Sequence, residues 1–130
     1  MVEINWLVYG SSGAKTKEPG GVMERFRCHS LPGHRLNTHV KSIVDPRRVC
    51  GMIGCHEAAR LSGIAVDSHG DKVKAHFGER VPQQDVIRIN HYDIKSYEEF
   101  LGKRARVRAR VNTMRDFNYF EMYDLNDIKE

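Results

Sequence analysis

One stretch of the sequence, residues 86–100, constrains the fold of this chain more than any other part. It predicts a buried strand that runs through a short loop directly into a capped helix. Its first residues are mostly β-branched, and Ile87 and Ile89 lie on one face of an extended chain. Ser96 and Glu99 have the spacing of a capping box, so a helix is expected to begin at Ser96.

The end of this predicted strand carries residues that suit an anionic ligand. Strand alternation places His91 on the apolar face, and Lys95 comes directly before the helix. The backbone N–H groups at the start of a helix attract phosphates and carboxylates, and an imidazole is a common metal ligand. The pattern therefore indicates an anion pocket beside a metal ligand, with an ordinary surface junction as the alternative.

Length and composition limit how the chain is organised. Its 130 residues, 40% hydrophobic and 29% charged, suit one compact domain spanning residues 1–130. Cys28, Cys50 and Cys55 cannot all pair within one chain, so reduced thiols are expected. The sequence has neither a basic leader nor an apolar run of roughly 20 residues, so we expect a cytoplasmic location, with the membrane surface as an alternative.

The remaining periodicity predicts a mixed α/β (α+β) fold. The expected strands cover residues 4–9, 41–44, 64–66, 73–77 and 86–92. The expected helices cover residues 22–28, residues 96 to about 111, and a stretch within 114–128. Residues 49–59 have no clear assignment, and residues 10–21 are expected to form a binding loop or a mobile one.

Two other functions fit parts of the sequence. Zinc accepts cysteine and histidine ligands, but the pairs Cys50/Cys55 and His34/His39 are spaced more loosely than in structural zinc sites. The net charge of +4 and the basic run at 103–110 suit a nucleic acid, a membrane surface or a phosphorylated ligand. The aromatic residues that follow have helical spacing, which is more typical of a core than of a base-stacking surface.

Four sequence blocks follow one another in an order typical of one enzyme family. They are WLVYGSSG at 6–13, GVMERF at 21–26, KSIVDP at 41–46 and NHYDIKSYEEF at 90–100. With these blocks the chain resembles the C-terminal part of GT-A glycosyltransferases of the family 2 and family 92 kind. The resemblance implies a partial GT-A-like mixed sheet flanked by helices.

The resemblance also implies an activity and its site residues. The expected reaction is inverting transfer of a sugar from a nucleotide diphosphate sugar to a hydroxyl of a glycan or lipid-linked acceptor. Mn²⁺ or Mg²⁺ is expected in the intact enzyme, with His91 at the metal and Lys95 and Ser96 at the diphosphate. Glu24 is implied as the catalytic base, with Glu18 as the alternative.

The acceptor is expected to lie against the first block, at Trp6, Tyr9, Ser11 and Ser12. The chain lacks the Asp-x-Asp motif of such enzymes, and a hard divalent cation needs several oxygen ligands. We therefore expect the acceptor-side portion of a transferase, completed by an upstream half or a second copy. A basic nucleic-acid-binding module or a non-catalytic interaction module is the alternative.

Overall fold

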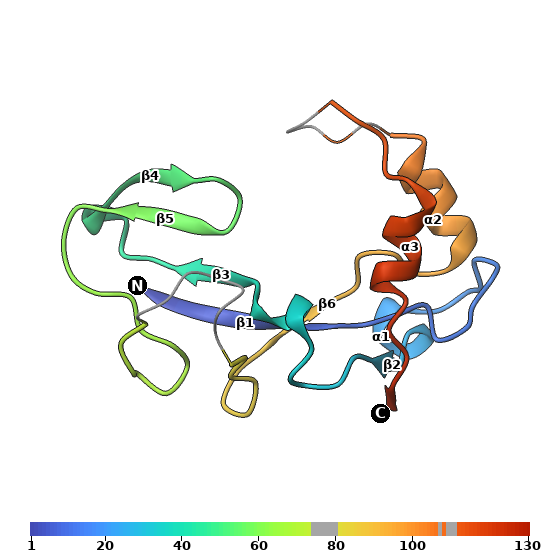
Figure 1. Cartoon of the computed structure of the whole chain (residues 1–130), viewed down its shortest axis with the longest axis horizontal. Coiled ribbons are helices and arrows are strands. Elements are labelled where there is room, and N and C mark those ends of the chain that lie inside the picture. The colour runs from blue at the N-terminus through green and yellow to red at the C-terminus, as the bar shows by residue number, and fades with distance from the viewer. Residues whose placement is uncertain (74–80, 107, 109–111) are drawn as a thin grey trace. The chain divides into compact units, whose positions relative to one another are not determined.

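The structure is a computed structural model that describes residues 1–73, 81–106, 108 and 112–130. Over these residues the chain has a mixed α+β fold, with short helices and several small sheets (Figure 1). This confirms the expected fold class. Internal contacts distinguish two compact units: unit 1 comprises Met1–Leu7 and Pro32–Asn90, and unit 2 comprises Val8–Leu31 and His91–Glu130.

Strand β1 (Val2–Val8) is the central strand of a three-stranded sheet with the order β3-β1-β6. It runs antiparallel to β3 (Val40–Ile43), with Val2 opposite Ile43. All residues of β1 after Val2 are buried, as the sequence predicted for an inner strand with bulk on both faces. The edge strand β6 spans only Ile89–His91.

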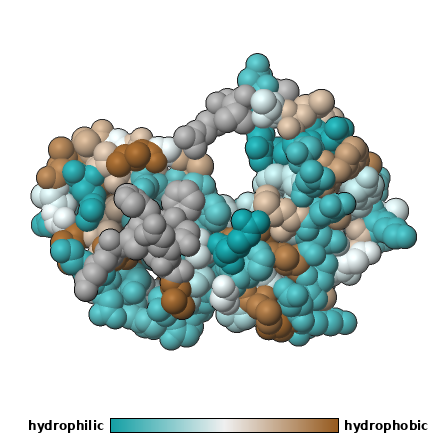
Figure 2. Space-filling model, in the orientation of Figure 1, coloured by the Kyte–Doolittle hydropathy of each residue, from teal (hydrophilic) through white to brown (hydrophobic). Residues whose placement is uncertain are grey.

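Residues 49–59, which carry no clear prediction, contribute an antiparallel hairpin to unit 1. Its strands are β4 (Val49–Ile53) and β5 (Glu57–Arg60), and Gly54 adopts a φ of 90° at the turn, where glycine is favoured. Figure 2 shows hydrophobic residues at the surface of this region. The side chains that are more than half exposed include Met52, Ile53 and Leu61.

Unit 2 contains the α-helices of the described chain and a second small sheet. The helices are α1 (Val22–Arg25), α2 (Tyr97–Arg104) and α3 (Phe117–Tyr123). The sheet pairs β2 (Cys28–His29) with β7 (Ile128–Lys129). In unit 1, short 3-10 helices cover Arg35–Thr38 and Pro46–Arg48.

Helix α2 begins where the sequence predicted. Ser96 is its N-cap and forms the expected capping box with Glu99. The helix ends at Arg104, so the basic run begins at the negative end of the helix dipole. The side chain of Phe100 is fully buried and packs on Phe120 of α3, with ring centroids 5.1 Å apart.

Two predicted elements are shorter than expected. Val86 is 61% exposed and Ile87 is 47% exposed, so the buried strand predicted over 86–92 is wrong outside β6. Helix α1 ends before Phe26, because the backbone there becomes extended and the side chain is buried. The periodicity identified the inward-facing Phe26 but overestimated the length of the helix.

Two further predictions fall partly on residues outside the described ranges. The residues expected as a strand at 64–66 do not form a regular strand: Val66 makes isolated bridges to Val2 and to Lys72, and the Val73 N–H donates to the Ala65 carbonyl over 2.9 Å. Most of its expected partner at 73–77 lies outside the described residues. The helix expected to run to about residue 111 is shorter than predicted, because α2 ends at Arg104.

Candidate functional site

A cavity of about 550 Å³ lies in unit 2 at the start of α2. Its size falls within the range of small-molecule sites. The lining side chains come from the loop before α2, from one face of the helix and from the residues just after it: Tyr92, Asp93, Ile94, Lys95, Glu99, Gly102, Lys103 and Arg106. The sequence had predicted a ligand site at this junction.

Asp93 is the central anionic group of the cavity. Lys103 Nζ donates to the Asp93 carboxylate and to its backbone oxygen, and the Tyr119 hydroxyl donates to the other carboxylate oxygen. Burial raises the pKa of Asp93, but the hydrogen bonds from Lys103 and Tyr119 outweigh it and hold the pKa below its ordinary value. Asp93 is therefore ionised, and both of its carboxylate oxygens accept hydrogen bonds. Its ion pair holds Lys103 in place.

A second carboxylate at the cavity, that of Glu99, is also paired. Arg25 Nη2 lies 2.6 Å from Glu99 Oε2, and Arg25 Nη1 lies 3.3 Å from Oε1, which is a bidentate ion pair. The hydrogen bond from Arg25 is the main reason that the pKa of Glu99 falls to about 2. Both acids that line the cavity are therefore neutralised by neighbouring cations.

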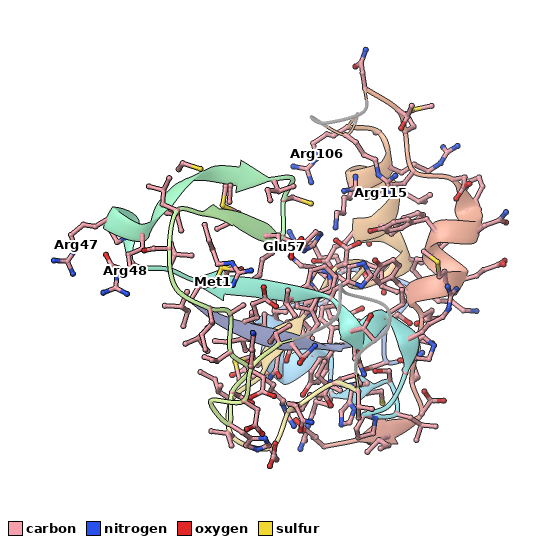
Figure 3. The ribbon with its side chains drawn as sticks, turned by 60° about the vertical axis from the view of Figure 1, so that its left-hand side comes forward. Met1, Arg47, Arg48, Glu57, Arg106 and Arg115 are labelled. Carbon is pink, nitrogen blue, oxygen red and sulfur yellow. The ribbon has the colours of Figure 1, made fainter. Side chains whose placement is uncertain are left out.

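Lys95 and Arg106 are the cations of the cavity that have no such partner. Neither makes an ion pair with any residue that the structure describes. Figure 3 shows Arg106 extending from the part of the chain that follows α2. Lys95 has a φ of 60°, which non-glycine residues rarely adopt and which functional sites often retain. The cavity therefore presents uncompensated positive charge.

The start of α2 does not provide the free N–H groups that the sequence predicted. The Tyr97 N–H donates to the carbonyl of Ala14, and the Glu98 N–H donates to the carbonyl of Lys15, both over 3.0 Å. The loop before α1 thus occupies the donors that would attract a phosphate. That prediction is wrong, because the bonds join segments far apart in the sequence.

Ser96 is fully buried and serves as a helix cap. Its hydroxyl donates to Glu99 Oε2 over 2.8 Å and accepts the Glu99 N–H over 3.3 Å. The hydroxyl that was expected at a diphosphate is thus engaged within the capping box. Of the two residues predicted at the diphosphate, Lys95 alone has a side chain without a hydrogen-bond or ion-pair partner among the described residues.

The two glutamates predicted as a catalytic base lie outside the cavity lining. Glu24 Oε2 accepts the N–H of Gly21 over 2.8 Å, so this carboxylate caps α1. Glu18 Oε1 accepts the hydroxyl of Thr16 over 2.8 Å in an exposed loop. The structure therefore gives both carboxylates local hydrogen-bonding roles.

His91, predicted as a metal ligand, lies half-buried at the end of β6. Its carbonyl accepts the N–H of Tyr9 over 3.1 Å, and its ring is edge-on to Tyr123, with centroids 6.2 Å apart. Among the described residues, no three side chains of His, Cys, Asp or Glu gather as a metal-binding group, and Cys28, Cys50 and Cys55 form no disulfide with one another. By themselves these residues do not fit Mn²⁺ or Mg²⁺, which need several oxygen ligands.

Trp6, expected at the acceptor, is a core residue of unit 1. It is 5% exposed, and its ring stacks on His39 with centroids 4.9 Å apart. His56 packs edge-on against the same indole at 5.2 Å. The structure therefore assigns Trp6 to the packing around β1, and the other expected acceptor residues lie in unit 2.

Those other residues also make internal hydrogen bonds. The buried Tyr9 donates its hydroxyl to Glu130 Oε2 over 2.7 Å. The Ser11 N–H donates to Asp124, and Ser12 Oγ accepts two backbone N–H groups at residues 27 and 28. The Gly-Ser-Ser-Gly loop is thus held in place by the closing segment of the chain.

Sequence reasoning missed Asp93, Lys103 and Arg106. A signal for part of the set was present, because residues 99, 102, 103 and 106 have the spacing of one helical face in the sequence, although α2 itself ends at Arg104. No spacing rule could have connected Asp93 with Tyr119 on another helix.

Comparisons with protein-family models, with curated proteins and with solved structures found no match to this chain. Among the described residues, none of the helices combines the length and the apolar character that crossing a membrane requires.

Proposed function

We propose that this chain is the acceptor-side portion of an inverting glycosyltransferase, and that the cavity at Lys95 receives the diphosphate of a nucleotide diphosphate sugar. The observation that carries the proposal is the pair of cations, Lys95 and Arg106, which have no acidic partner among the described residues. Cations arranged in advance around a leaving diphosphate stabilise the charge that develops during transfer.

Contacts among the sequence blocks support the same proposal. Arg25 of the second block pairs with Glu99 of the fourth block, which lines the cavity. Residues 14 and 15, just after the first block, bond the start of α2. The second and fourth blocks are thus joined within unit 2, as expected if they belong to a common functional site, whereas the third block lies in unit 1.

Within this proposal the residues of the chain have distinct tasks. Lys95 and Arg106 would contact the phosphate oxygens, since they are the uncompensated cations. Asp93 would position Lys103 and hold it at the wall of the cavity. The nucleotide pocket and the carboxylates for a divalent cation would come from the upstream half or from another chain.

The alternative expected from the sequence is a nucleic-acid-binding module. Its aromatic residues would have to present open ring faces to bases. Phe120 instead packs on Tyr97 and Phe100, and the exposed ring of Phe117 is covered by the guanidinium of Arg104 at 4.4 Å. This packing favours the glycosyltransferase proposal over a stacking surface.

Binding of pyrophosphate to the full chain tests the proposal. A screened cation contributes about 1 kcal/mol, which is about fivefold in affinity. Two such cations give about 2 kcal/mol, so we expect a dissociation constant on the order of tens of millimolar. Lys95→Gln should weaken binding about fivefold. Lys72→Gln, an exposed lysine of unit 1, is the matched control. Calorimetry that shows equal binding by Lys95→Gln and by the unmodified chain would contradict the proposal.

A further inference from the structure

A second cavity of unit 2, of about 440 Å³, lies beside α3. Arg108 and Arg115 line it together with Tyr119, Met122 and Tyr123 of the helix. Its volume suits a ligand the size of one or two sugar rings, because small-molecule sites begin at about 300 Å³. It is distinct from the cavity at Lys95, with which it shares no lining residue.

The described lining of this second cavity carries a net positive charge, with two arginines and one aspartate. The guanidinium carbons of Arg108 and Arg115 lie 4.8 and 5.5 Å from the centre of the Tyr119 ring, and neither arginine makes an ion pair with a described residue. The acid in the lining, Asp116, accepts the N–H of Tyr119 over 2.9 Å as the cap of α3. Two cations therefore face the cavity beside one acid that already has a structural role.

One hydrogen-bond donor of Arg115, its Nε–H group, is buried and has no acceptor among the described residues. Buried donors are nearly always satisfied in folded proteins, so each exception requires an explanation. An oxyanion bound between Arg115 and Arg108 would supply the acceptor and the opposite charge at once, with the forked geometry that guanidinium groups favour. Figure 3 shows Arg115 among the side chains at this end of unit 2.

The rest of the lining suits a sugar better than a bare anion. Met114 is 56% exposed and Met122 is 37% exposed, so apolar surface lies next to the cations, while Tyr119 and Tyr123 stack on each other with ring centroids 4.7 Å apart. Sugar rings combine apolar C–H faces with polar substituents, so both kinds of surface are needed to bind them. The lining therefore combines the two features that an anionic sugar requires.

We propose that this cavity binds an acidic sugar residue of the acceptor, with the carboxylate or phosphate of that sugar at Arg115 and Arg108. The proposal rests on the proposed glycosyltransferase function and names the acceptor class. A negatively charged acceptor would be selected over a neutral one, because the buried arginine donor is left unpaired when no anion is present.

Titration of the isotopically labelled full chain by NMR tests this site. Glucuronate and glucose 6-phosphate should shift the signals of the Arg115 Nε–H and of Tyr119, whereas glucose should not; the two acids distinguish a carboxylate from a phosphate. Arg115→Gln should weaken binding of at least one acidic sugar about tenfold, as expected for a lost charge-assisted hydrogen bond. Arg115→Lys, which keeps the charge, should retain part of the affinity.

Arg47→Gln is the control, because this exposed arginine pairs with Asp45 in unit 1. Equal shifts with glucose, or the absence of shifts with both acids, would overturn the proposal. Inorganic phosphate or a uridine oligonucleotide that binds as tightly as the acidic sugars would also overturn it. If the unmodified chain binds glucuronate but does not bind pyrophosphate, that result contradicts the donor site alone.

Discussion

At the residue scale, Gly10 is the position with the least free space among the described glycines. A Cβ built there would lie 2.5 Å from the carbonyl oxygen of Leu125 and 2.5 Å from Asn126 Oδ1. The nearby Ser12 N–H also donates to Asn126 over 2.8 Å, so the two segments cannot separate without losing a bond. The first block of the sequence thus requires a glycine for a close approach of backbone.

We expect Gly10→Ala to lower the free energy of unfolding by about 1–3 kcal/mol, the usual cost of overpacking. Urea denaturation at neutral pH measures the change. Gly33→Ala is the matched control, because no atom lies within 4 Å of its added Cβ. If both variants unfold at the same urea concentration, the contact with residues 125 and 126 does not constrain the loop.

At the scale of the elements, the ion pair between Arg25 and Glu99 ties the end of α1 to the start of α2. Glu99 also completes the capping box with Ser96, so one carboxylate serves both helices. Its pKa falls from an ordinary value of 4.5 to about 2 on folding, mainly through the hydrogen bond from Arg25. Because the folded state holds this proton less tightly than the unfolded state, the ionised carboxylate stabilises the fold.

This stabilisation is fully present above about pH 4.5 and is lost as the pH falls towards about 2. Thermal unfolding followed between pH 2 and pH 7 should therefore show a steep loss of stability in that window. Glu99→Gln should make the curve shallower, whereas Glu121→Gln, an exposed glutamate of α3, should leave it unchanged. If Glu99→Gln loses stability with falling pH as steeply as the unmodified chain, the ion pair between Arg25 and Glu99 is not the cause of the pH dependence.

At the scale of the whole molecule, the structure provides too few contacts for a complete nucleotide sugar. A lysine contact contributes about 1 kcal/mol, and micromolar affinity needs about 8 kcal/mol. The N–H groups of Tyr97 and Glu98 at the start of α2 are already bonded to the loop before α1. The affinity of the described cavity must therefore come mainly from Lys95 and Arg106.

We expect the chain alone to bind UDP and GDP sugars weakly and to show no measurable turnover, with Mn²⁺ present. Calorimetry and a sugar-transfer assay check the two statements. A dissociation constant in the low micromolar range would mean that these 130 residues hold the nucleotide site, contrary to the proposed acceptor-side role.

Local spacing was enough to predict the elements around which the site is built. The capping box of Ser96 and Glu99 and the inner strand β1 follow from residues that are neighbours along one helical turn or one strand. Helix caps and strand faces depend on a few neighbouring residues, so they can be predicted from the local sequence. The mixed fold class follows from such patterns as well.

Only the tertiary structure decided which charges at the site are available. Arg25 and Glu99 are 74 residues apart in the sequence, yet their ion pair neutralises one acid of the cavity. Lys103 pairs with Asp93, and a distant loop bonds the N–H groups at the start of α2. Within the part of the chain that the structure describes, Lys95 and Arg106 are the cations of this cavity that have no acidic partner. Pairing over such separations depends on how the unit packs, and residue spacing does not encode it.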